Sequence, residues 1–104
     1  MGIIKLSTNI PEGEDKEVKI LFDGRRRKLV QITLRNSTVL SKHKAPDPIT
    51  VQCIAGSGTF YIGEKNEEKA ELTPGTIITL EENVIHEIKA EPAVSLLLTR
   101  FIKD

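Results

Sequence analysis

The stretch PGTIITLEENVIH, residues 74–86, contains a turn, a strand, a second turn and a histidine that follows an apolar residue. Its first two residues predict a type II turn, with Gly75 at the position that needs a positive φ. Asn83 predicts the second turn, because asparagine tolerates the left-handed backbone conformation. His86 alternates with apolar residues from Val84 onward, so we expect its ring to face the interior of a β-structure.

The same two-residue periodicity runs through most of the chain. Apolar residues alternate with their neighbours in four segments, at residues 18–22, 30–34, 49–53 and 84–88. A last segment, 94–102, is apolar on both faces up to Leu98, which is expected of a strand covered on both sides. No stretch of ten or more residues has a convincing helical stripe. Many short strands separated by turns predict an all-β sandwich or barrel.

Turn-forming residues separate these segments at short intervals. Asp23-Gly24 predicts a hairpin with a type I′ turn. Gly56-Ser57-Gly58 predicts a tight bend with unusual dihedrals, and residues 64–72 are interpreted as part of a hairpin. Residues 7–16 carry proline, glycine and many charges, so we expect an exposed arm there.

Length and composition limit the class of protein. A chain of 104 residues forms one domain, and 15 basic residues balance 15 acidic ones. Without a basic excess we expect no nucleic-acid partner, and without a long apolar run we expect no membrane partner. The lone Cys53 cannot form an internal disulfide and fits a reducing compartment. We therefore expect a cytoplasmic protein.

Residues 75–86 resemble the second motif of the cupin superfamily, G-x5-P-x-G-x2-H. Gly75 and His86 take the first and last positions, while Glu81 and Asn83 replace the proline and the inner glycine. The resemblance covers about residues 18–102. It implies a single-domain, all-β jelly-roll barrel (a double-stranded β-helix) over residues 17–102, preceded by an arm or edge strand at residues 1–16.

The first cupin motif, H-x-H with a glutamate and a glycine downstream, is matched in part. Gly56 fits the final glycine, and counting back places Ile49 at the glutamate position. If His43 is the first histidine, Ala45 takes the place of the second. If His43 is the second, Asp47 becomes the nearest carboxylate, two residues out of place. The pattern is similar to a subgroup of small cupins with a degenerate first motif.

The cupin resemblance implies that His43 and His86 lie opposite each other across the barrel lumen. There they could bind a divalent transition metal (Fe, Mn, Ni or Zn), with Asp47 as a third ligand. Cys53 is a weaker alternative ligand, and we interpret it as a core residue instead. If the lumen takes an anion, Lys42 or Lys44 could guide it there.

Three hypotheses of function follow from these residues. The first is a small-molecule-binding protein of unassigned reaction, with its ligand pocket around His43 and His86. The alternative is a metal-dependent enzyme of the dioxygenase or isomerase type, with His43, His86 and Asp47 as a reduced ligand set. The third is an interaction or scaffold domain. The apolar residues 3–6 could pair as a strand with a neighbouring subunit, so we expect a homodimer.

Overall fold

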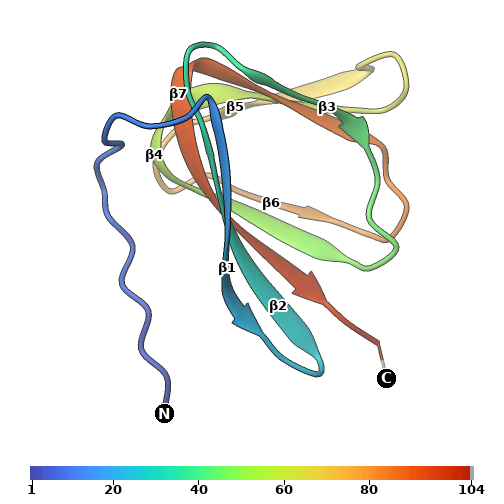
Figure 1. The fold of residues 1–104 in the computed structure, drawn as a ribbon. Helices are drawn as coiled ribbons and strands as arrows, with labels where there is room; N and C mark the ends of the chain where they lie inside the picture. The colour runs from blue at the N-terminus through green and yellow to red at the C-terminus, as the bar shows by residue number, and fades with distance from the viewer. Residues whose placement is uncertain (104) are drawn as a thin grey trace.

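The computed structural model describes residues 1–103 and is built from β-strands and turns, without a helix in that range (Figure 1). The all-β prediction is therefore confirmed. The strands are β1 (Lys16–Asp23), β2 (Arg27–Leu34), β3 (Val39–His43), β4 (Ile49–Ile62), β5 (Glu68–Leu72), β6 (Ile77–Leu80) and β7 (His86–Phe101). Residues 1–103 thus contain no helix long and apolar enough to cross a membrane.

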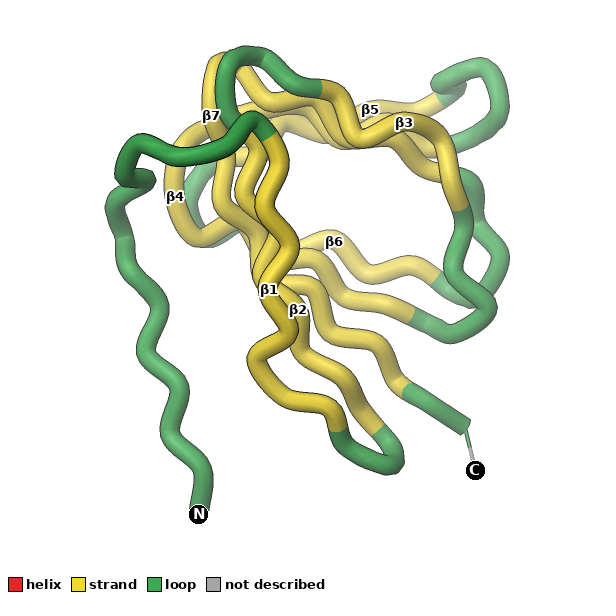
Figure 2. The backbone as a smooth tube through the Cα atoms, in the orientation of Figure 1, coloured by secondary structure: helices red, strands yellow, loops and turns green. Residues whose placement is uncertain are grey.

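All strand pairs are antiparallel, and the sheet has the order β1-β2-β7-β4-β5. Strand β3 pairs with β7, and β6 pairs with β4. In Figure 2 the strands form two layers, with β3 and β5 in one layer and β1, β2 and β6 in the other. The long strands β4 and β7 take part in both layers. The sheet does not close, so the closed barrel expected from the sequence is replaced by an open, folded-over sheet.

The segment Gly56-Ser57-Gly58 lies inside β4 and does not separate two strands. The pairing of β4 with β7 shifts register on both sides of Gly56, which has a φ of 77°. A Cβ atom there would collide with the carbonyl oxygen of Ala93. The predicted bend is therefore a pair of bulges that turns β4 from one layer to the other. In the same way β7 is one strand, where two had been expected at residues 84–88 and 94–102.

The turns at Gly75 and Asn83 have positive φ values of 97° and 64°, as their residue types predicted. Residues 64–72 belong to the β4–β5 hairpin, as expected. The hairpin at Asp23-Gly24 is also present, but its type I′ turn was wrong. Gly24 has no positive φ, and its amide donates to the carbonyl of Arg27 at 3.0 Å, so the loop is longer than a two-residue I′ turn.

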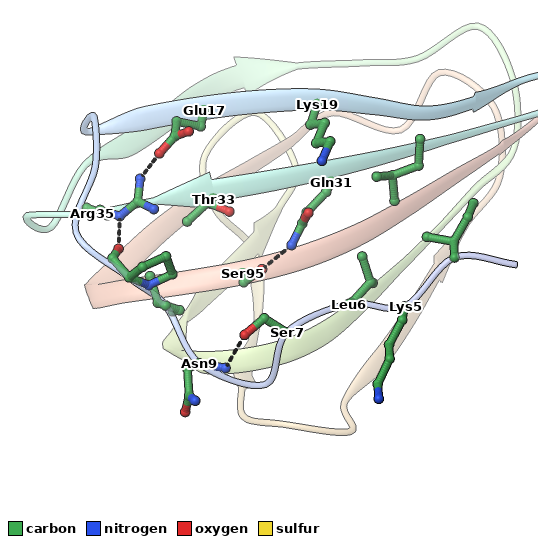
Figure 3. A pocket seen from close by; sticks show the side chains of 14 residues that line it. Lys5, Leu6, Ser7, Asn9, Glu17, Lys19, Gln31, Thr33, Arg35 and Ser95 are labelled. Atoms are coloured by element: carbon green, nitrogen blue, oxygen red, sulfur yellow. Dashed lines mark hydrogen bonds and ion pairs between the residues drawn. The ribbon is translucent and has the colours of Figure 1, made fainter.

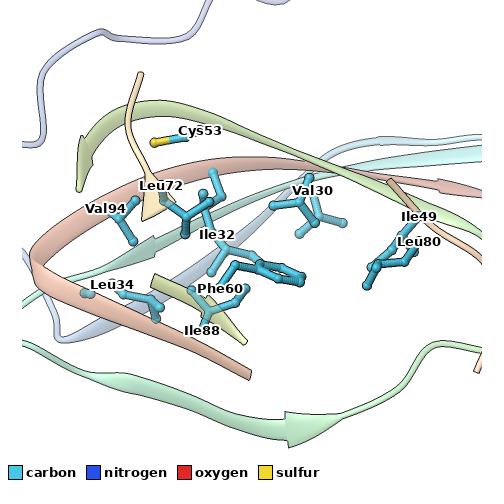
Figure 4. Close-up of a cluster of buried hydrophobic side chains, with 13 residues drawn as sticks. Val30, Ile32, Leu34, Ile49, Cys53, Phe60, Leu72, Leu80, Ile88 and Val94 are labelled. Atoms are coloured by element: carbon cyan, nitrogen blue, oxygen red, sulfur yellow. The ribbon is translucent and has the colours of Figure 1, made fainter. Parts of the chain in front are cut away.

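The core lies between the two layers and consists of aliphatic side chains around Phe60 (Figure 4). Its alternating positions on β2, β4 and β7 are those expected from the sequence. The members of this core are Val30, Ile32, Leu34, Ile49, Val51, Cys53, Phe60, Leu72, Leu80, Ile88, Ala90, Val94 and Leu96. On β1, Val18 and Ile20 pair with core residues but remain more than half exposed, because β1 is an end strand of the sheet.

Residues 1–15 form no strand and run beside β1 and β2 as an arm. Arg35, which directly follows β2, holds this arm, because its guanidinium donates to the carbonyls of Pro11 at 2.7 Å and Glu14 at 2.8 Å. A cavity of about 370 Å³ lies between the arm and the sheet (Figure 3). Residues 3–6 are outside any strand in the single chain, and Ile3 is 80% exposed. Their pairing with a second subunit stays a prediction.

Candidate functional site

A pocket of about 240 Å³ contains both histidines, and we call it the two-histidine pocket. It lies where the end of β3, the loop after it, the start of β4 and both ends of β7 come together. Ile49 pairs with Arg100 and Ile62 pairs with His86, so the register places the two ends of β7 at opposite ends of β4. The sheet folds over at the register shifts around Gly56, and residues from both ends therefore line the same pocket. The lining residues are His43, Lys44, Ala45, Pro46, Ile49, His86, Leu98 and Arg100.

His43 and His86 are in direct contact. They are paired residues of β3 and β7, and their ring centroids lie 4.1 Å apart with an angle of 63° between the planes. The expectation that they face each other across the lumen was wrong in this detail. A register shift between Leu40 and His43 carries His43 to the end of β3, directly beside His86. Both rings nevertheless border one pocket.

His86 is 1% exposed, and its ring stacks on Phe60 with centroids 5.4 Å apart and planes 6° apart. Its Nδ1 donates to the carbonyl oxygen of Val84 at 2.9 Å, because a carbonyl can only accept. Burial, the largest cause, lowers the pKa of His86 below its ordinary value of 6.5, and the nearby His43 lowers it further. The neutral ring therefore carries a lone pair on Nε2.

No residue between 1 and 103 forms a hydrogen bond with Nε2 of His86, although this atom is buried. A buried polar atom without a partner costs about 1–3 kcal/mol. Core histidines that serve only packing normally have both nitrogens satisfied. The unpaired Nε2 therefore makes His86 the strongest candidate for a functional residue of this pocket.

His43 has the same ring arrangement in an exposed position. Its Nδ1 donates to the carbonyl oxygen of Ser41 at 2.7 Å, which leaves the lone pair on Nε2. Histidine ligands of metals usually show this arrangement, with Nδ1–H bound to a carbonyl and Nε2 free for the metal. The imidazoles of His43 and His86 are thus both suitable metal ligands.

A third protein ligand is missing from the described chain. Asp47 does not line the pocket, and its Oδ2 accepts from Nη2 of Arg100 at 2.5 Å and from Nε at 3.2 Å. Within residues 1–103 no group of three or more His, Cys, Asp or Glu side chains could hold a metal ion. The set His43, His86 and Asp47 therefore does not fit a metal held by three protein ligands, and Asp47 has a structural partner instead.

Cys53 is 1% exposed and belongs to the core, as expected because it shares one face of β4 with Ile49 and Val51. Its thiol donates to the carbonyl of Ala55 at 3.7 Å, and burial raises its pKa. It is not among the residues that line the two-histidine pocket. A raised pKa keeps the thiol protonated, so Cys53 is a packing residue and not a ligand.

Sequence reasoning missed Arg100 as a pocket residue. Its position carries a signal, because Val94, Leu96, Leu98 and Arg100 share one face of β7. An arginine that continues an apolar face is unusual and needs a partner. Asp47 is that partner, and the contact spans 53 positions of sequence, so it is visible only in the folded chain.

No family model and no curated protein sequence matches this chain. Solved structures do match it. A cupin superfamily protein from Desulfitobacterium hafniense has a TM-score of 0.79 at 14% identity, with 89% of this chain and 84% of that chain covered. An RmlC-like cupin protein from Desulfovibrio desulfuricans has a TM-score of 0.77 at 13% identity over 94% and 96%.

A conserved protein of unknown function from Streptococcus pyogenes is also similar, with a TM-score of 0.77 at 17% identity over 89% of this chain and 79% of that chain. Identities this low establish a shared architecture and leave the reaction open. The expectation from the motifs at residues 43–56 and 75–86 is confirmed at the level of architecture. This chain has the fold of small single-domain cupins.

Proposed function

We propose that the protein binds a small molecule in the two-histidine pocket, with a reaction that is not assigned. The observation that carries this proposal is the buried Nε2 of His86, which has no hydrogen-bond partner in residues 1–103. His86 and His43 both line the pocket, so the two imidazoles border the space that a guest would occupy. A side chain that is kept at a cost to stability is typical of a functional site.

The size and lining of the pocket support an organic ligand. A water molecule occupies about 30 Å³ in the liquid, and a dry cavity of about 150 Å³ can hold benzene. A volume of about 240 Å³ therefore exceeds what one water on Nε2 would need. Apolar walls from Ala45, Pro46, Ile49 and Leu98 and a few polar groups are the usual composition of ligand sites.

A fragment screen followed by ¹H–¹⁵N NMR tests the proposal. We expect shifts of the backbone amides of Ala45, Ile49 and Leu98 for at least one fragment class, and weaker binding of the same fragments to His86→Phe. Shifts confined to the cavity under the N-terminal arm, at Ser7 and Gln31, would place binding elsewhere and contradict the proposal. The arm cavity thus serves as an internal control, since it is larger and lies on the other side of the sheet.

A metal-dependent enzyme of the dioxygenase or isomerase type is the second candidate. The observation in its favour is that His43 and His86 both donate from Nδ1 to a backbone carbonyl, leaving both Nε2 atoms available. A bound metal (Fe, Mn, Ni or Zn) would supply Lewis acidity and open coordination positions. Metal content near one per chain after reloading with any of these ions would support this candidate, and content below a tenth would exclude it.

The proposed location is the cytoplasm. Cys53 is a buried free thiol, and an unpaired cysteine suits a reducing compartment. Fractionation of the native host with a fluorescent fusion at the C-terminus tests this. Signal in the cytoplasmic fraction is expected, and export to another compartment would contradict it.

A further inference from the structure

We infer that the ligand of the two-histidine pocket is a small hydroxy acid, whose carboxylate binds Arg100 and Lys44 and whose hydroxyl donates to Nε2 of His86. This inference rests on the proposed function and adds the chemical class of the ligand. It depends on two features of the lining: the sign of its charges and the direction of its hydrogen bonds.

The charged residues that line the pocket are basic. Lys44 and Arg100 contribute positive charges, and none of the eight lining residues is acidic. Asp47 contacts Arg100 from outside the lining, and Glu87, next to His86 in sequence, lies 3.6 Å from the amine of Lys42. Nearby carboxylates are thus already paired, and Lys44 leaves the pocket with an excess of positive charge.

Arg100 is suited to bind a carboxylate. Its contacts within residues 1–103 use two N–H groups, both directed to Oδ2 of Asp47, out of the five that a guanidinium carries. Asp47 holds the planar group in one orientation, and the side chain of Arg100 is 33% exposed, so other N–H groups can meet a ligand. The planar fork matches a carboxylate in a two-point contact.

The group that approaches His86 must be a hydrogen-bond donor. The neutral ring presents a lone pair on Nε2, because Nδ1–H is bound to Val84. A carboxylate oxygen would be repelled by that lone pair. An ammonium group could donate, but the positive charges of Lys44 and Arg100 oppose it. A hydroxyl has the right direction and no charge.

Mandelate and two analogues test the inference on the full chain by ¹H–¹⁵N NMR titration. Mandelamide lacks the charge, and phenylacetate lacks the hydroxyl. Mandelamide loses a hydrogen bond to a charged group, and phenylacetate leaves the buried Nε2 of His86 without a donor. Each loss weakens binding about tenfold, so we expect mandelate to bind about tenfold more tightly than either analogue. The pocket walls leave space for the phenyl ring.

Two variants separate the two contacts. Arg100→Gln is expected to abolish the preference for mandelate over mandelamide and to keep the preference over phenylacetate. His86→Phe is expected to abolish the preference for mandelate over phenylacetate and to keep the preference over mandelamide. Arg27→Gln is the matched control, because Arg27 stacks on Phe22 outside the pocket and its loss leaves both preferences unchanged.

The outcomes distinguish the inference from the proposed function. If mandelamide or phenylacetate binds at the pocket amides within threefold of mandelate, the hydroxy-acid inference is overturned and the binding pocket stands. If neutral fragments shift those amides and mandelate leaves them unshifted, the conclusion is the same. If no compound of any class shifts them, both fail. The comparison of probes uses the unmodified chain, so it decides the question even if Arg100→Gln does not fold.

Discussion

Replacing His86 with phenylalanine is the most informative change for the account, because it separates a functional histidine from a structural one. The unpaired Nε2 destabilises the folded protein by about 1–3 kcal/mol, and the substitution removes this penalty. The substitution also removes the hydrogen bond from Nδ1 to Val84, which stabilises the protein by about 0.5–1.5 kcal/mol. The aromatic stack on Phe60 can be retained. Added ring volume can project into the adjoining pocket of about 240 Å³.

The expected result is a protein that is more stable by about 1 kcal/mol and binds its ligand more weakly. For a domain of this size such a change raises Tm by about 4–8 °C. Urea unfolding and a thermal scan at pH 8, where the imidazole is neutral, measure it. Ile88→Ala, two residues along the same strand and equally buried, is the control and is expected to lose about 2–5 kcal/mol.

The reasoning is refuted if His86→Phe lowers the unfolding free energy by more than about 1 kcal/mol at pH 8. That result would mean that His86 stabilises the core as an ordinary buried residue.

Three further predictions concern pH, backbone and assembly. The pKa of folded His86 lies below its unfolded value of 6.5, so the unfolded state binds more protons between the two values. The unfolding free energy should therefore fall as the pH drops below about 6.5. Urea unfolding of the wild type and of His86→Phe measures this fall, and its absence would mean that the neutral-ring assignment is wrong. Gly56→Ala should lower the unfolding free energy by about 2 kcal/mol or more, because of its positive φ and its close approach to the backbone of Ala93. Gly75→Ala, which also has a positive φ but lies in open space, should lower it by about 1 kcal/mol in the same assay. Equal losses would contradict the bulge at Gly56. Light scattering should give twice the chain mass, Ile3→Asp should reduce it to one chain and the equally apolar Ile77→Asp should not; a monomer at micromolar concentration would refute the homodimer.

Strand positions and the direction of His86 could be predicted because they depend on local rules. Alternation places every second side chain on one face, and His86 is accordingly buried beside Ile88. The turns at Gly75 and Asn83 follow from residues that accept positive φ. These features need only a few neighbouring residues.

Other features depend on contacts between distant segments. Gly56-Ser57-Gly58 is compatible with either a turn or a bulge, and its pairing with β7 decides for the bulge. Whether the sheet closes depends on the length and curvature of all its strands, which no local pattern contains. Asp47 pairs with Arg100, 53 positions away in the sequence, and no local pattern predicts that contact. Its spacing from His43 suggested a metal ligand instead.

A crystal structure of the protein purified from its native host, without chelator, is the most direct test of the central claim. We predict density for an organic molecule in the two-histidine pocket, with a donor atom within hydrogen-bond distance of Nε2 of His86. A pocket filled by repacked side chains, with Nε2 bonded to another residue of the chain, would contradict the account.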